Sequence, residues 1–120
     1  MEEITLEYID IFDENKTKEI RFSKGEIKEP FKESSLFVNI IDGKSMEPLI
    51  SDKAVIVSDI SNKVLIDGGI YLVYYENKMW VKKYNEKKEV FFSINSLFSH
   101  LVYGKKDVHI VGKVVLTFNP

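Results

Sequence analysis

Short runs of apolar residues separated by polar turn signals most limit what this chain of 120 residues can fold into. Runs rich in β-branched and aromatic side chains and bounded by Gly, Asn or Asp are typical of strands. Such runs occupy residues 4–12, 20–22, 36–41, 54–57, 70–75, 78–84, 89–93 and 108–118. We therefore predict a compact, mainly β fold of about seven or eight short strands with little helix.

Turn residues join several of these runs into hairpins. Glu76-Asn77 is a two-residue turn that places Lys82 opposite the preceding strand. Asp67-Gly68-Gly69 is a second strong turn signal. Residues 46–50 are expected to form a helical turn, and the last apolar run is expected to be a long strand with an exposed edge.

Composition excludes several classes of function. The chain has no cysteine, so disulfides, thiolate zinc sites and thiol catalysis are excluded. His100 and His109 are too few and too isolated for a metal site, and we expect no metal and no cofactor. A net charge of −2 argues against broad binding to nucleic-acid phosphates. No apolar run approaches the length of a membrane span, so we expect a cytoplasmic protein with no membrane partner.

The stretch Asp42-Gly43-Lys44-Ser45-Met46-Glu47-Pro48 is the first candidate site. Gly43 permits a positive φ, and Pro48 has a fixed φ and no N–H, so Ser45 lies on a sharply turned segment. A serine on a turn is most often only a turn residue. It becomes a nucleophile only if a base lies within hydrogen-bond reach.

A candidate base lies 37 residues after Ser45, in Met79-Trp80-Val81-Lys82-Lys83-Tyr84. A lysine acts as a general base only when it is neutral, which requires burial or a nearby cation to lower its pKa. In a strand, Lys82 shares a face with Trp80 and Tyr84, whereas Lys83 lies on the other face. Both faces carry apolar neighbours, so periodicity alone does not choose between the two lysines.

These residues resemble the LexA-like serine peptidases, which comprise the C-terminal domains of LexA and of phage CI-type repressors, together with UmuD. The resemblance covers roughly residues 36–118 and rests on four segments in order. They are Gly43-Lys44-Ser45-Met46-Glu47-Pro48, Val81-Lys82-Lys83-Tyr84, Phe92-Ser93-Ile94-Asn95 and Ile110-Val111-Gly112-Lys113-Val114-Val115. The resemblance places the catalytic serine at Ser45 and the catalytic lysine at Lys82, with Met46 bordering the substrate cleft. It also implies a compact β-clip-type fold.

The same resemblance divides the chain and suggests a substrate. Residues 1–34 correspond to an arm or linker that carries the cleavage segment, and residues 35–120 to the peptidase and dimerisation domain. Cleavable relatives carry an Ala-Gly or Cys-Gly bond, but the single alanine here is Ala54 and no such bond is present. Counting back from Ser45 by the distance seen in those relatives reaches Ile9-Asp10-Ile11. Lys53 and Ala54 occupy positions where the family commonly has Gly-Asp.

The resemblance implies a regulatory domain of a transcriptional repressor that cleaves its own N-terminal arm, as a homodimer, in the SOS response to DNA damage. A RecA filament would stimulate cleavage. DNA would be bound only by a separate N-terminal helix-turn-helix domain, for which the first forty residues lack the helical period. Two alternatives stay open: a non-catalytic dimerisation module with a relic dyad, and a UmuD-like accessory protein.

Overall fold

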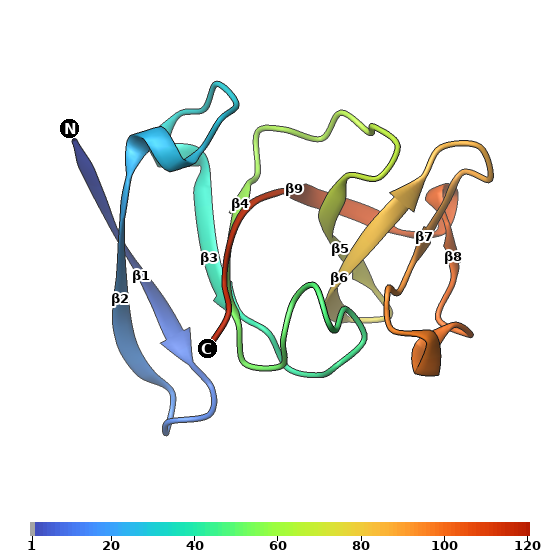
Figure 1. Cartoon of the computed structure of the whole chain (residues 1–120), viewed down its shortest axis with the longest axis horizontal. Coiled ribbons are helices and arrows are strands. Elements are labelled where there is room, and N and C mark those ends of the chain that lie inside the picture. The colour runs from blue at the N-terminus through green and yellow to red at the C-terminus, as the bar shows by residue number, and fades with distance from the viewer. Residues whose placement is uncertain (1) are drawn as a thin grey trace.

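The computed structural model describes residues 2–120 and consists mainly of antiparallel strands (Figure 1). The strands are β1 (Glu3–Asp10), β2 (Lys16–Ser23), β3 (Leu36–Ile40), β4 (Val55–Asp59), β5 (Ile70–Tyr75), β6 (Lys78–Asn85), β7 (Val90–Phe92), β8 (Tyr103–Gly104) and β9 (His109–Phe118). The short 3-10 helices are η1 (Lys24–Glu26), η2 (Glu33–Ser35), η3 (Ser96–Phe98) and η4 (Lys105–Asp107). The prediction of a mainly β fold is confirmed.

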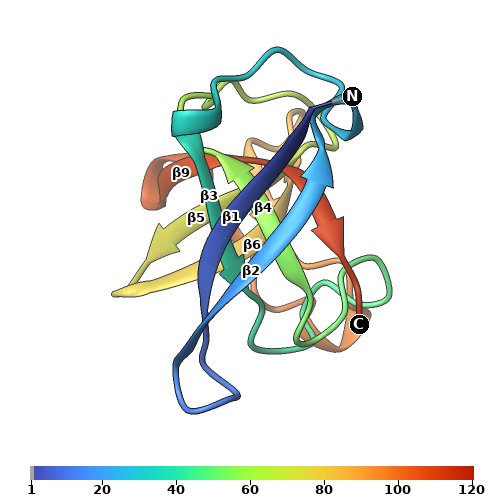
Figure 2. The same ribbon diagram turned by 90° about the vertical axis from the view of Figure 1, so that its left-hand side faces the viewer.

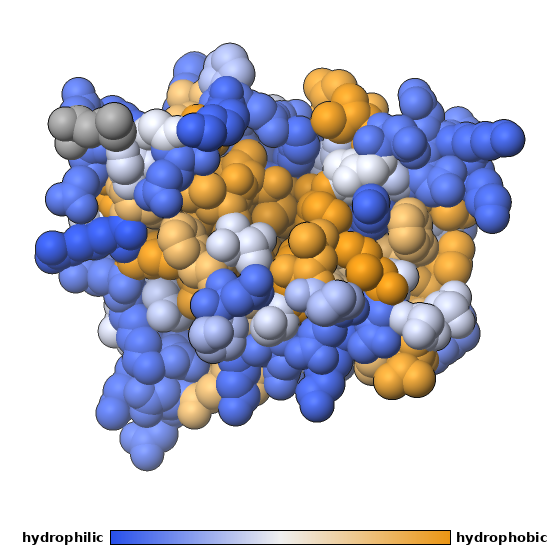
Figure 3. Space-filling view, viewed as in Figure 1, coloured by the Kyte–Doolittle hydropathy of each residue, from blue (hydrophilic) through white to orange (hydrophobic). Residues whose placement is uncertain are grey.

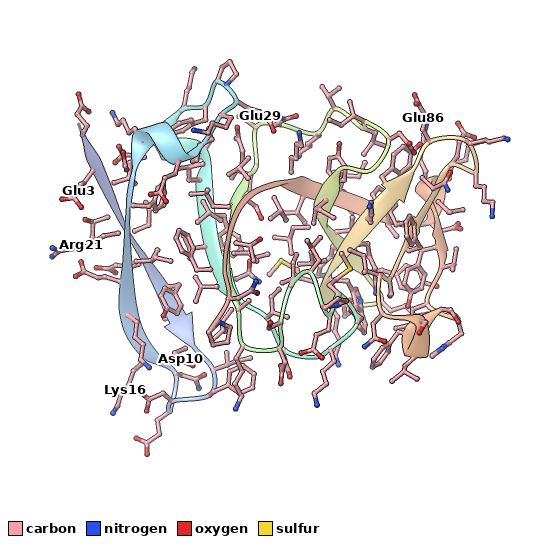
Figure 4. All side chains as sticks on the ribbon, in the orientation of Figure 1. Glu3, Asp10, Lys16, Arg21, Glu29 and Glu86 are labelled. Atoms are coloured by element: carbon pink, nitrogen blue, oxygen red, sulfur yellow. The ribbon has the colours of Figure 1, made fainter. Side chains whose placement is uncertain are left out.

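Strands β1 and β2 form a separate two-stranded hairpin with an unbroken antiparallel register from Glu3↔Ser23 to Asp10↔Lys16. Its turn places Glu14 and Asn15 at positive φ. The returning strand is longer than the run 20–22 predicted from sequence, because continuous pairing with β1 recruits the polar residues before it. Figure 4 shows Glu3 and Arg21 pointing away from the body of the molecule on the outer side of the hairpin.

The other strands form one sheet with the order β3-β4-β9-β5-β6-β7-β8. Strand β9 pairs with β4 on one side and β5 on the other, so the expectation that its edge is exposed is wrong. The edge strands are β3 and β8. Gly112 lies where β9 passes β4, and an added Cβ there would come within 2.4 Å of the Asp59 carbonyl oxygen. This close crossing lets β9 occupy the middle of the sheet.

The hairpin β5–β6 has the two-residue turn predicted for it, with Glu76 at φ 49° and Asn77 at φ 64°. Positive φ at both central residues matches the type I′ turns that suit the twist of a hairpin. Lys82 lies opposite Tyr71 in the resulting register. Strand β7 pairs only with residues 83–85 of β6, so the first half of β6 has one unpaired edge.

Three apolar clusters hold these elements together. One packs Ile4 and Phe22 of the hairpin against Val38 and Val57 of the large sheet, and Figure 2 shows the hairpin crossing over β3 and β4. A second cluster contains Met46 of the loop between β3 and β4, and a third surrounds Tyr71 and Phe91. On the face drawn in Figure 3, hydrophobic residues gather in the middle and hydrophilic residues surround most of them.

Candidate functional site

Ser45 lies in the loop between β3 and β4, whose two ends are fastened together. Ile41 N–H donates to the Ala54 carbonyl (2.8 Å), and Lys53 N–H donates to the Ile41 carbonyl (2.9 Å). Within the loop, Gly43 has a φ of +123°, a conformation that requires glycine. Its N–H donates to Asp52 Oδ1 at 2.8 Å. These contacts fix the backbone on both sides of Ser45.

The segment after Ser45 is a turn rather than the helical turn expected from sequence. Ile50 N–H donates to the Met46 carbonyl (2.9 Å), but the Glu47–Pro48 peptide bond is cis and no helix forms. Lys53 has a φ of +69°, which favours glycine. Lys53 is one of the two positions where the LexA-like pattern has Gly-Asp, and a positive φ is the conformation that glycine adopts most readily.

The backbone N–H groups of Ser45 and Met46 have no acceptor among the hydrogen bonds of residues 2–120. Unpaired N–H groups beside a serine hydroxyl are the donors that stabilise an oxyanion. The Met46 side chain is buried (2% exposed) in the cluster that includes Ile50 and Leu72. Met46 therefore anchors the loop to the core while its edge borders the groove described next.

Ser45 opens onto a largely apolar groove of about 630 Å³. The groove is lined by residues 6–9, Ile11 and Thr17 of the hairpin, residues 36–42 of β3 and the following loop, Ser45, Met46, Leu72, and residues 78–81 of β6. Consecutive rather than alternate residues of three strands line it, so the edges of these strands border the groove. Unpaired strand edges of this kind bind extended peptides by adding a strand.

Two residues reached by counting back from Ser45 lie in this groove. Ile9 and Ile11 line it together with Ser45, and about half of each side chain is exposed. Asp10, between them, is turned the other way and is held by Lys18 Nζ (2.6 Å) and Phe12 N–H (2.9 Å). Figure 4 shows Asp10 and Lys16 at the turn end of the hairpin. The structure thus brings this segment and Ser45 to one groove.

Lys82 is the most unusual side chain in the molecule, because it is fully buried (0% exposed) without an acidic partner within residues 2–120. Its Nζ donates to Ser93 Oγ at 2.7 Å. Two aromatic rings flank the amine: the Trp80 ring at 5.2 Å and the Tyr103 ring at 5.9 Å, measured to their centroids. Burial lowers the pKa of Lys82 from 10.5 to about 8.

Burial separates the two lysines that sequence periodicity left equivalent. Lys83 is half-buried on the opposite face of β6, whereas Lys82 points into the interior. Removal from water disfavours the charged form of an amine, and no carboxylate offsets that cost. Of the two, Lys82 is therefore the residue with the property a general base requires.

Ser45, in the loop between β3 and β4, and Lys82, on β6, share no hydrogen bond among those that the described residues make. The segment after β7 connects them. Ser93 accepts from Lys82, and two residues later Asn95 N–H donates to the Ser45 carbonyl (3.0 Å). The Asn95 side chain also donates to the Lys44 carbonyl (2.9 Å). One short segment therefore holds both the amine and the backbone of the serine loop.

The motif Phe92-Ser93-Ile94-Asn95 predicted no separate role for Ser93 or Asn95, and Trp80 was expected only to share a strand face with Lys82. Their contacts depend on strands β7 and β8 folding back along β6, which no local pattern reveals. The shared strand face of Trp80 and Lys82 was the one signal available. His100 and His109 are exposed, and residues 2–120 contain no group of three His, Cys, Asp or Glu side chains suited to a metal ion.

A comparison with protein families matches residues 2–115 to the family described as Peptidase S24-like. The chain belongs to this family. The Peptidase S24-like family contains the C-terminal domains of LexA and phage repressors and UmuD, so the resemblance found in the sequence is confirmed. A search of curated proteins finds no match. Over residues 2–120, no helix is long and apolar enough to span a membrane.

Proposed function

We propose that this chain is a Ser-Lys peptidase domain of a LexA-like regulator and that Ser45 and Lys82 are its catalytic pair. The observation that carries this proposal is Lys82, a buried lysine with a pKa of about 8 and no acidic partner among the described residues. Placing an unpaired amine in a protein interior lowers stability, so its presence calls for a functional reason. Membership of the Peptidase S24-like family supplies one.

In the proposed reaction, neutral Lys82 removes the proton of Ser45 Oγ, which then attacks a peptide carbonyl. The free N–H groups of Ser45 and Met46 donate to the oxyanion. Protonated Lys82 gives its proton to the leaving amine, and water then releases the acyl group from Ser45. For the first step the amine must leave Ser93 and reach Ser45, since it donates to Ser93 at 2.7 Å in this structure.

The proposed substrate is the chain's own N-terminal arm. Ile9 and Ile11 already line the groove of Ser45, and the flanking strand edges suit an extended peptide. Cleavage requires the end of β1 to leave its pairing with β2. A RecA filament would favour the released arm, and dimerisation would belong to the remainder of the domain.

Mass spectrometry of the pure protein after incubation at pH 9 tests this proposal. We expect two fragments whose masses add up to the intact mass plus one water. Ser45→Ala and Lys82→Met should abolish them, whereas the matched control Lys83→Met should cleave like the wild type. Cleavage that persists in the Ser45 and Lys82 variants would reject the proposal.

A non-catalytic dimerisation module is the second candidate, and the hydrogen bond of Lys82 to Ser93 instead of Ser45 favours it. The absence of an Ala-Gly or Cys-Gly bond from the sequence points the same way. This candidate predicts an unchanged mass at pH 9 together with a dimer by light scattering.

A further inference from the structure

Trp80 belongs to both the groove and the surroundings of Lys82. Its side chain lines the groove with Ser45, and its ring centroid lies 5.2 Å from Lys82 Nζ. Lys82, Ser93 and Tyr103 do not line the groove. The indole therefore lies against both the groove, where the serine lies, and the buried surroundings of the amine, which Trp80, Ser93 and Tyr103 form and which are called the chamber below.

Contacts with Tyr75 and, through it, Tyr103 hold the indole in this place. Trp80 Nε1 donates to the Tyr75 carbonyl at 3.4 Å, and the Tyr75 ring packs against Tyr103 at a centroid distance of 4.4 Å. The Tyr103 ring centroid in turn lies 5.9 Å from Lys82 Nζ. The chamber is thus a connected set of aromatic side chains with Ser93 Oγ as its hydrogen-bond acceptor.

We propose that Trp80 is a positioning residue that closes the chamber of Lys82 toward the groove and so sets the pH at which this amine can serve Ser45. The inference rests on the proposed function for its consequence in catalysis. The effect of Trp80 on the pKa of Lys82 can be tested even if the protein cleaves no peptide.

The indole has two opposing effects on the pKa of Lys82, and their balance decides whether removing Trp80 raises or lowers it. The ring attracts the charged amine, which for a desolvated pair raises the pKa by about one and a half units. It also keeps water out, and burial lowers the pKa from 10.5 to about 8. Exclusion of water is the larger effect, so opening the chamber should raise the pKa of Lys82.

Three other titratable side chains lie near the amine or the indole, and each has its own contacts. Lys78 also lies over the Trp80 ring, at 5.8 Å, and is exposed. Tyr75 is next to Glu76, which raises its pKa above 10.0, and Asp107 acts in the same direction. Tyr71 pairs with Lys82 across the hairpin and is bonded through its hydroxyl to Val64 and Ile66.

The test is a pH titration of the lysine ¹³Cε signals by NMR, in which the Lys82 signal is identified by its loss in Lys82→Met. We expect a midpoint near pH 8 in the wild type and in Trp80→Phe, which keeps an aromatic wall. Trp80→Ala should move the midpoint up by about one pH unit or more and slow any cleavage at pH 7 about tenfold. Met79→Ala is the matched control, because Met79 lines the groove but lies on the other face of β6 from Lys82, and it should leave the midpoint unchanged.

Wild-type fluorescence gives a second measurement that requires no variant of Trp80. Trp80 is the only tryptophan in the chain, so its emission reports this one site. We expect a step near pH 8 that disappears in Lys82→Met and persists in Lys78→Met.

The inference is overturned if Trp80→Ala titrates like the wild type, or if the fluorescence step is absent or survives in Lys82→Met. If the titrations behave as expected but no variant or wild-type sample ever cleaves, the proposed function fails and the role of Trp80 stands.

Discussion

Replacing Lys82 by Met should make the protein more stable at neutral pH, although it removes the proposed base. Met has a similar length but no charge, so it fills the same site without the cost of burying an ammonium. The pKa of Lys82 lies at about 8 instead of 10.5. At 1.36 kcal/mol per pH unit, burial of the charged amine therefore lowers the free energy of unfolding by about 3 kcal/mol.

The hydrogen bond to Ser93 sets a limit on this gain. In the Met variant Ser93 Oγ loses its partner, which costs about 1 kcal/mol. We therefore expect Lys82→Met to be about 2 kcal/mol more stable than the wild type at pH 7.

The advantage should depend on pH in a defined direction. Below pH 8 Lys82 is charged in both the folded and the unfolded protein, so the wild type bears the full penalty. Between about 8 and 10.5 the folded state has lost the proton and the unfolded state keeps it, so wild-type stability rises with pH. The advantage of Lys82→Met should shrink across this interval.

Urea unfolding between pH 6.5 and 10 measures this difference, with Lys83→Met as the control for removing an amine from β6. The control should show no such trend, since Lys83 is partly exposed on the other face. A Lys82→Met variant that is less stable than the wild type at pH 7, or whose advantage does not change with pH, would refute the reasoning.

Three further predictions concern other contacts. Ser93→Ala removes the acceptor of the Lys82 amine, which stabilises the charged form more than the neutral one, so the Lys82 midpoint in an NMR titration should fall by about half a pH unit. Asp10→Asn should destabilise the protein at pH 7 in urea unfolding, and the difference should shrink as the pH falls below 3.8: the bond from Lys18 lowers the pKa of Asp10, so its contribution is present above pH 3.8 and is lost as the pH falls through the folded value. Ser58→Ala should leave the urea midpoint unchanged or raise stability by up to about 1 kcal/mol, because Ser58 Oγ is buried with no partner in the described part of the chain.

Local patterns predicted the parts of the fold that depend on neighbouring residues. The strands at 70–75 and 78–84 and the turn at Glu76-Asn77 were correct, because alternation and turn chemistry act over a few residues. The position of β9 was not predicted correctly, since the order of strands in a sheet is decided by contacts between distant segments. An apolar final strand fits the middle of a sheet as well as an edge.

The candidate site was also predicted only in part from the sequence. Residue types, order and spacing led to Ser45 and Lys82 through a family resemblance, and the family is confirmed. The lowered pKa of Lys82 could not be predicted from the sequence, because the amine is surrounded by Trp80, Ser93 and Tyr103 from three separate segments. The choice between Lys82 and Lys83 required the direction of side chains in the folded hairpin.

The rate of self-cleavage as a function of pH tests the central claim most directly, that one buried amine acts as the base for Ser45. We predict a rate that rises with pH, reaches half of its maximum near pH 8, levels off above that value, and vanishes in Ser45→Ala. A rate that keeps rising tenfold per pH unit through pH 10, or that is the same in Ser45→Ala, would contradict the account.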